Sequence, residues 1–141
     1  MRLEFEIWNE EFGMKTEKTP QDIKERSFSF AVEIVKLCRS LDPKCVSSRN
    51  ISYQLTKAGT SIGANLEEAH AGQSRSDFIH KLSIASKEAR EAHYWLRILS
   101  AAEISTSQDL TLLIKEANEV VAILTAILRK TKANTSNSAL S

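Results

Sequence analysis

The sequence predicts an all-α protein, an antiparallel up-down-up-down four-helix bundle with a short N-terminal arm and a disordered C-terminal tail. Three observations favour this fold. Four long stretches carry apolar residues at alternating spacings of three and four, which keeps one face of a helix against its partners. Residues that cap helices precede these stretches. With 4 glycines and 2 prolines in 141 residues, the chain has few turn formers for an all-β fold.

The chain divides into an arm (residues 1–19), the bundle (20–132) and a tail (133–141). In the arm, apolar and charged residues alternate from Leu3 to Ile7, a strand-like pattern that is too short to be stable alone. We expect a flexible arm, or one that docks on its own bundle or on a neighbour. The tail is small and polar, which is typical of a disordered terminus.

The first helix is expected to begin at Thr19-Pro20, a cap followed by a favoured first-turn residue, and to end before Asp42-Pro43. Two apolar stripes make its apolar face wide. One stripe consists of Ile23, Phe30, Ile34, Leu37 and Leu41, and the other of Phe28, Ala31, Val35 and Cys38. The second helix, from Ser47-Ser48 to about Gly72, has one stripe, formed by Ile51, Leu55, Ala58, Ile62, Asn65 and Ala69.

The third helix should start after Ser74, because Ser74 and Asp77 resemble a capping box. Its stripe is Phe78, Leu82, Ala85, Ala89, Ala92, Leu96 and Leu99. Capping residues at positions 105–107 precede the fourth helix, whose stripe is Leu110, Leu113, Ala117, Val120, Leu124 and Ile127. The short connections favour antiparallel neighbours.

Gly59 and Gly63 interrupt the second helix pattern, four residues apart and on one face. Each costs about 1 kcal/mol relative to Ala inside a helix. A loop at Gly59 is one interpretation. Because the apolar stripe continues without a phase shift, we favour close approach of a neighbouring backbone or an aromatic ring, with Phe28 and Phe30 as candidates. A phosphate-binding loop is disfavoured, because no Lys-Ser or Lys-Thr follows Gly63.

Asn65 falls on the predicted seam. We favour an edge position with its amide satisfied by neighbouring backbone over a buried residue that fixes register. Antiparallel pairing of the second and third helices would place Asn65 near Lys81 and Lys57 near Glu88. We therefore expect an interhelix polar cluster that serves packing or assembly specificity, formed by Lys57, Asn65, Glu68, Lys81 and Glu88.

No pattern predicts catalysis, a cofactor or a small-molecule substrate. Glu67 and His70 form one Glu-x-x-His, whereas di-iron bundles need two. The two cysteines, Cys38 and Cys45, lack the spacing of a zinc site. No run of about 18 apolar residues predicts a membrane span, and the first residues do not resemble a signal peptide. We expect a cytoplasmic protein that is not an enzyme and does not enter a membrane.

Charge is nearly balanced, with 19 Lys and Arg against 18 Asp and Glu and a net charge of +1. Such a chain has no overall field that attracts nucleic acid. Arg129, Lys130 and Lys132 end the fourth helix, where cations complement the helix dipole. Contact with nucleic acid is the alternative. Bases on the middle helices are interspersed with Glu88 and Glu91, which indicates a mixed solvated surface.

Apolar residues outside the four seams exceed the needs of one bundle, which takes about three per heptad on each helix. They predict an oligomer interface, because a bare apolar patch promotes aggregation. We assign this interface to Phe28, Trp95 and Ile98, with Ile114, Val121 and Leu128 as further surplus.

The stretch from Phe28 to Leu99 carries a specific set of residues. They are Phe28–Ala31, Gln54-Leu55, Gly59–Asn65, Glu68-Ala69, Ser74, Asp77-Phe78, Lys81, Ala85, Lys87–Ala89 and Tyr94–Leu96. In these residues the chain resembles the four-helix bundle proteins encoded in intervening sequences of bacterial 23S rRNA genes. That family is similar to the accessory variability proteins of diversity-generating retroelements, pentameric barrels that bind RNA and a reverse transcriptase.

The resemblance implies a homopentamer of antiparallel bundles with no known catalytic activity and a poorly defined role. The surplus apolar residues favour a non-enzymatic, self-assembling scaffold or adaptor. The alternative function is an RNA- or DNA-binding accessory protein that recruits nucleic acid or a polymerase-type partner. The retroelement relatives are strongly basic and this chain is nearly neutral. Any binding of nucleic acid should therefore be weak and sensitive to salt.

Overall fold

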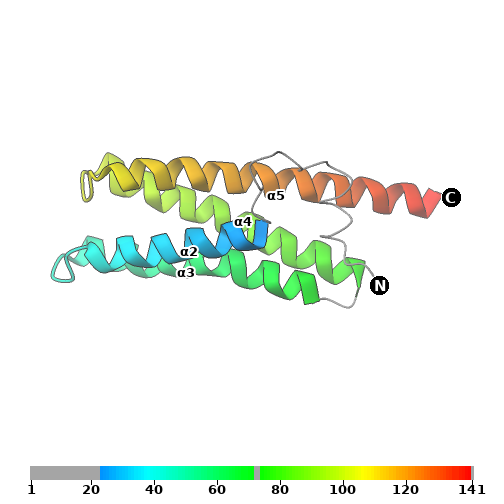
Figure 1. The fold of residues 1–141 in the computed structure, drawn as a ribbon, viewed down its shortest axis with the longest axis horizontal. Coiled ribbons are helices and arrows are strands. Elements are labelled where there is room, and N and C mark those ends of the chain that lie inside the picture. The colour runs from blue at the N-terminus through cyan, green and yellow to red at the C-terminus, as the bar shows by residue number, and fades with distance from the viewer. Residues whose placement is uncertain (1–22, 72–73, 141) are drawn as a thin grey trace.

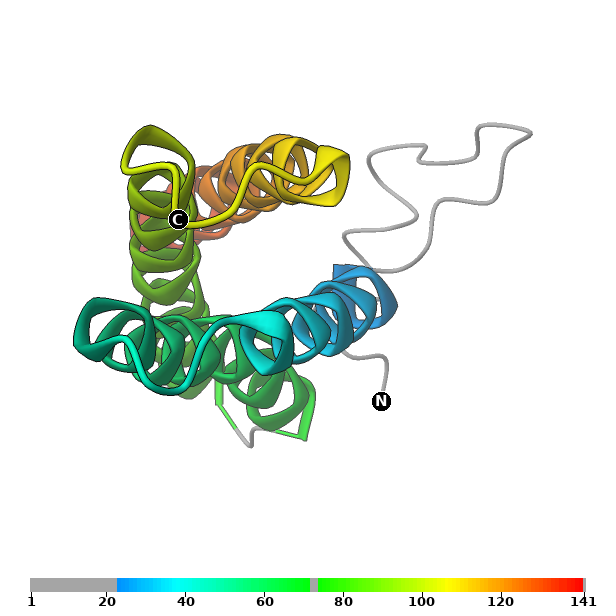
Figure 2. The same cartoon turned by 90° about the vertical axis from the view of Figure 1, so that its left-hand side faces the viewer.

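The computed structural model describes residues 23–71 and 74–140, with side chains through residue 137. These residues form four helices and no strand: α2 (Ile23–Ser40), α3 (Val46–Ala71), α4 (Arg75–Ala101) and α5 (Gln108–Leu140). Consecutive helices run antiparallel (Figure 1). Seen along the long axis, they follow one another around the bundle in chain order, so α2 lies diagonally across from α4 (Figure 2). The all-α four-helix bundle is confirmed.

The helix boundaries follow local hydrogen bonds. Ser74 caps α4, because its Oγ accepts a hydrogen bond from the backbone N–H of Asp77 at 3.1 Å. Ser107 does the same for α5 by accepting from the N–H of Leu110. The turn after α2 is held by Asp42, whose carboxylate accepts from the N–H of Lys44. The expected start at Thr19-Pro20 and the arm of residues 1–19 lie outside the described residues.

Each helix contributes one apolar stripe to a common core. The fully buried large side chains are Ile34, Leu55, Ile62, Leu66, Leu82, Leu96, Leu99, Leu110, Leu124, Ile127 and Val120. α3 packs against α2 and α4, α4 packs against α5, and α5 returns to α2. An ion pair links the first and last of these helices, with Arg26 Nε donating to Glu116 Oε1 at 2.5 Å and Nη2 donating to Oε2 at 3.3 Å.

The structure corrects the seam of α3, where Leu66 rather than Asn65 is buried. Asn65 is half-buried, and its Nδ2 donates to the carbonyl oxygen of Ser61 at 2.8 Å. Burying Leu removes more apolar surface from water, and the Asn amide is satisfied within its own helix. The position that Asn65 takes is the edge position, with a backbone partner, that the sequence favoured over the register-fixing one.

The structure also differs from the expectation at the C-terminus, where α5 continues to Leu140 and the disordered tail was expected from residue 133. Thr131 is buried and its Oγ1 donates to the carbonyl of Ile127. The next hydroxyls repeat this bond one turn on, from Thr135 to Thr131 and from Ser136 to Lys132. Small polar side chains thus bond back to the helix that they extend, whereas composition alone indicated disorder.

Candidate functional site

The two helix glycines lie where α3 approaches α2. A Cβ added at Gly59 would stand 2.9 Å from Cγ2 of Ile34, closer than side chains tolerate. A Cβ at Gly63 would lie 3.7 Å from the carbonyl carbon of Ser27, which is ordinary van der Waals contact. Gly59 therefore determines the close approach of the two helices. Its neighbour is the side chain of Ile34 rather than an aromatic ring, whereas Gly63 faces the backbone of Ser27 and Phe28, one of the expected neighbours.

The expected polar cluster separates into two pairs between α3 and α4. Glu68 Oε2 and Lys81 Nζ form an ion pair at 2.5 Å. One end of the other pair is Glu88, whose pKa is raised by burial and by nearby Glu91, while Lys87 and Lys57 oppose that rise. Asn65 joins neither pair, since it bonds to its own helix. The structure therefore brings together Glu68 with Lys81 and Lys57 with Glu88, but not all five residues.

The outer face of α2 carries a row of exposed apolar side chains, which we call the α2 strip: Phe28, Val32 and Val35. Phe28 is 68% exposed, and the two valines are 36% exposed. The spacing of four and three places them on one face. The buried residues of α2, such as Phe30 and Ile34, lie on the face toward the bundle. α2 thus has two apolar faces, of which the bundle covers one.

Trp95 and Ile98, the other two residues assigned to the interface, are half-buried and pack against the core. The same holds for Ile114, Val121 and Leu128. These side chains offer less free apolar surface than the sequence indicated, because they close the gaps at the edges of the core. Among the three residues assigned to the interface, Phe28 alone is largely exposed.

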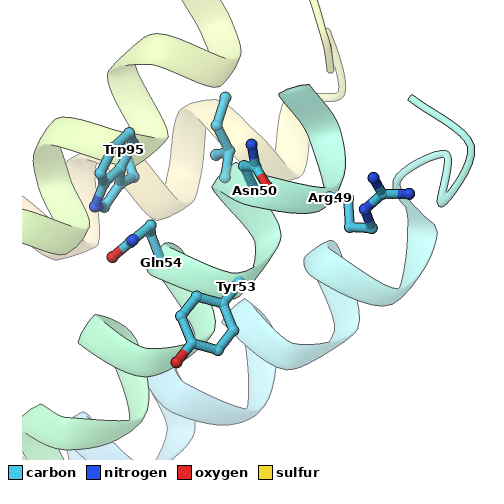
Figure 3. A pocket seen from close by; sticks show the side chains of 6 residues that line it. Arg49, Asn50, Tyr53, Gln54 and Trp95 are labelled. Carbon is cyan, nitrogen blue, oxygen red and sulfur yellow. The ribbon is translucent and has the colours of Figure 1, made fainter. Parts of the chain in front are cut away.

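Beside Trp95, α3 and α4 enclose a surface pocket of about 470 Å³ (Figure 3). Trp95 faces Gln54 across this pocket, and Tyr53 and Arg49 line its α3 side. The indole Nε1 donates to Glu91 Oε1 at 3.3 Å, and Tyr94 packs edge-on against the ring. This pocket, which we call the Trp95 pocket, is a second surface with aromatic character, and unlike the α2 strip it lies between α3 and α4.

A basic groove of about 390 Å³ lies between α4 and α5. We call it the α4–α5 groove; its lining is Ser83, Ser86, Lys87, Arg90, Thr125, Leu128, Arg129 and Lys132. Two of the three terminal cations singled out in the sequence, Arg129 and Lys132, thus meet two cations of α4. Lys130 does not line the groove, and neither does any acidic residue of the described chain.

Sequence reasoning missed Lys87 and Arg90 because Glu88 and Glu91 adjoin them. Neither acid lines the groove: Glu91 accepts from Trp95, and Glu88 interacts with its neighbour Lys87 and with Lys57 of α3. The spacing of the basic residues could have indicated the groove. Lys87 and Arg90 are three residues apart, as are Arg129 and Lys132, so each pair shares a helix face.

The structure offers no support for a metal centre in residues 23–71 and 74–140, where no three His, Cys, Asp or Glu side chains gather. The carboxylate of Glu67 forms an ion pair with Lys24 Nζ at 3.3 Å. None of the helices described is long and apolar enough to cross a membrane.

Both cysteines are free thiols. Burial raises the pKa of Cys38, although hydrogen bonds from Thr56 and Ser52 act against the rise. Cys45 is exposed, and its pKa is lowered chiefly by hydrogen bonding with Ser48. A half-buried thiol of raised pKa is a poor nucleophile. Cys38 therefore resembles a packing residue.

Comparison with known proteins agrees with the resemblance in the sequence. No curated protein matches the chain. The fold is similar to the crystal structure, at 1.70 Å resolution, of a protein with unknown function from the S23 ribosomal protein family of Bacteroides thetaiotaomicron VPI-5482. The two are 39% identical with a TM-score of 0.68, over 75% of this chain and 97% of that one. The 23S rRNA-intervening sequence proteins match residues 20–126, and the chain belongs to that family.

Proposed function

We propose that this protein is a non-enzymatic, self-assembling bundle that acts as a scaffold or adaptor. The observation that carries the proposal is the α2 strip, in which a large aromatic and two branched side chains face away from the core. Each square ångström of apolar surface withdrawn from water contributes roughly 25 cal/mol, so a second copy that covers the strip gains stability. A cytoplasmic bundle that needs no cofactor, membrane or small-molecule substrate fits this role.

The proposed assembly is a closed ring, and the number five comes from the resemblance to pentameric barrels. A ring needs two different surfaces on each subunit, one of which meets the other on the next copy. The α2 strip and the Trp95 pocket are two such surfaces, the first on α2 and the second between α3 and α4. Their apolar and aromatic side chains are of the kind enriched at the centres of protein interfaces.

Light scattering tests the proposal. The expected mass is about five times 15.8 kDa at micromolar concentration. Phe28→Asp should reduce the mass to that of one chain while circular dichroism retains the helix signal, because a buried unpaired charge is strongly unfavourable. Ser29→Asp is the matched control, since Ser29 is exposed on the same helix but lies outside the α2 strip. A wild-type mass of one chain contradicts self-assembly, and a dimer or tetramer contradicts the number five.

A second candidate function, an RNA- or DNA-binding accessory protein, is favoured by the α4–α5 groove. Four cations gather there in a chain whose net charge is only +1. Binding should be weak and should weaken steeply between about 50 and 200 mM salt, because counterions released from the nucleic acid drive it. Fluorescence anisotropy of a labelled RNA at both salt concentrations tests this. Tight binding that persists at the higher salt concentration contradicts the expectation.

A further inference from the structure

We propose that the α4–α5 groove is a phosphate-binding site that holds the phosphodiester backbone of a nucleic-acid strand without reading its bases. The proposal rests on the second candidate function and assigns it a place, a set of residues and a ligand chemistry. Figure 2 shows that α4 and α5 adjoin each other on the side of the bundle away from the outer face of α2.

Some cations elsewhere on the bundle already have a carboxylate partner within the subunit. Lys24, Arg26, Lys36 and Lys81 each have a carboxylate partner at 2.5–3.3 Å. In the part of the chain that the structure describes, Lys87, Arg90, Arg129 and Lys132 form no such ion pair. Their charge is therefore available to an anion from outside the subunit.

The four cations are distributed along the length of the groove rather than clustered at one point. Arg90 Nη2 donates to Thr125 Oγ1 at 3.4 Å, and this contact gives the register of α4 relative to α5 along the helix axes. Because the helices are antiparallel, Arg129 then lies opposite Ser86, and Lys132 opposite Ser83. The positive charges extend over about seven residues of α4, or roughly 10 Å of helix axis. That arrangement suits successive phosphates of a strand better than one small anion.

The floor of the groove holds a buried hydroxyl without a partner. Ser86 is 3% exposed, and its Oγ forms no hydrogen bond within the described chain. The other two hydroxyls of the groove are already engaged as donors, Ser83 to the carbonyl of Ile79 and Thr125 to that of Val121. A buried polar group that lacks a hydrogen bond is costly, so it calls for a partner. A phosphate oxygen would accept the hydrogen bond that Ser86 can donate.

The side chains that line the groove select phosphate rather than base. Its lining includes no aromatic ring on which a base could stack, and no Asn or Gln amide to pair with a base edge. Arg and Lys are the residues that contact phosphate, and Arg can do so through two parallel hydrogen bonds. Recognition should therefore be independent of sequence, in contrast to the Trp95 pocket, where aromatic and amide groups are present.

The test measures anisotropy of a fluorescein-labelled, mixed-sequence single-stranded RNA 20-mer at several salt concentrations. Arg90→Gln/Arg129→Gln should weaken binding at about 50 mM salt at least tenfold. It should also reduce the slope of log affinity against log salt by about 1.4, or about 0.7 for each phosphate that is no longer neutralised. Ser86→Ala should weaken binding a few-fold and leave the slope unchanged, because it removes a neutral donor.

The matched control is Arg97→Gln/Lys115→Gln, which removes the same charge from exposed positions of the same two helices outside the groove. It should bind like the wild type, and thermal melting should show all variants folded. If the wild type binds and both double variants bind equally, the groove is the wrong site while the second candidate function stands. If the wild type does not bind RNA even at the lowest salt concentration, both proposals are wrong.

Two further arms distinguish the source of the phosphate. Inorganic phosphate at matched ionic strength should compete only at millimolar concentration, and a DNA 20-mer of the same sequence should bind within a few-fold of the RNA. Full competition by micromolar phosphate would overturn the assignment to a strand backbone. A strong dependence on base sequence, measured with homopolymers, would overturn the claim that the bases are not read.

Discussion

The outer face of α2 and the groove between α4 and α5 lie on different sides of one bundle and have opposite chemistry. The α2 strip is three apolar side chains, and the groove is lined by four cations and no acid. In the sequence these features average to a net charge of +1 and an ordinary apolar fraction. The comparison shows that a near-neutral composition is compatible with strongly segregated surfaces, because a helix separates residues that adjoin in sequence.

The two sides suit different partners. An apolar strip gains from being covered by another copy of the chain, whereas a row of unpaired cations repels its equivalent on a second copy. Assembly through α2 would leave the groove open on every subunit. Several identical grooves on one ring would bind a long strand more tightly than one groove does.

The largest expected effect comes from disrupting one of the two surfaces at a time. Phe28→Asp should abolish assembly and leave the affinity of one groove for a short RNA unchanged. Arg90→Gln/Arg129→Gln should do the reverse, lowering RNA affinity while the mass by light scattering stays that of the wild type. If both variants lose both properties, the two surfaces are not independent and the comparison fails.

Next in size is the contact that seats α2 on α3. Gly59→Leu should destabilise the fold by about 1–3 kcal/mol or more, because even the first added carbon meets Ile34. The melting temperature should fall by roughly 3–10 °C. Gly63→Ala is the control; with room for its Cβ it should be neutral or stabilising by up to about 1 kcal/mol. Equal melting temperatures for the two variants would show that α3 does not approach α2 most closely at Gly59.

A smaller effect is expected where α2 meets α5. Glu116→Gln removes the charge that Arg26 binds through two hydrogen bonds, and it should cost about 1 kcal/mol, since both side chains are about one-third exposed. Glu119→Gln removes the same charge from an exposed position of α5. Urea denaturation at low and high salt compares them. A loss for Glu119→Gln as large as that for Glu116→Gln would mean that overall charge, rather than the pair, is responsible.

The smallest effect concerns pH and His93 on α4. Burial, together with the nearby Arg97 cation, lowers the pKa of His93. The unfolded chain then binds a proton more readily than the folded one, so stability rises with pH from the lowered folded pKa to about 6.5 and is flat above. His93→Gln should remove this rise from melting curves recorded between about pH 5 and 8. An unchanged pH dependence in the variant would assign the rise to other groups.

The sequence was sufficient for the order of the four helices and for most of the core, because spacings of three and four report the buried face directly, but it did not predict that α5 continues to Leu140. The α4 stripe from Phe78 to Leu99 and the Ser74 cap are as predicted. Where two adjacent residues both fit the spacing, as Asn65 and Leu66 do, periodicity cannot choose between them. Burial energy does, and it favours Leu66.

The candidate sites were harder to predict because they depend on how helices turn toward each other. Arg129 and Lys132 were recognisable in the sequence as a basic helix end. That they line one groove with Lys87 and Arg90 depends on the register of α4 relative to α5. Likewise, the neighbour of Gly59 depends on the rotation of α2, which brings Ile34 to it. Both are relations between helices, and no pattern within one helix contains them.

Because α5 continues to Leu140, we expect its two ends to differ in how often their backbone hydrogen bonds open. Thr131 is its last buried side chain in the described range, and the residues beyond it project past the other helices (Figure 1). No side chain from residue 132 to 137 is buried, so this end of α5 has less support from the core than the part near Leu124, and short stretches of unpacked helix open readily in water. Amide hydrogens there should exchange with deuterium far faster than those near Leu124. Since Lys132 stands at this boundary, a strand bound in the groove should slow the exchange from the frayed end, so that deuterium uptake would report occupancy without any label.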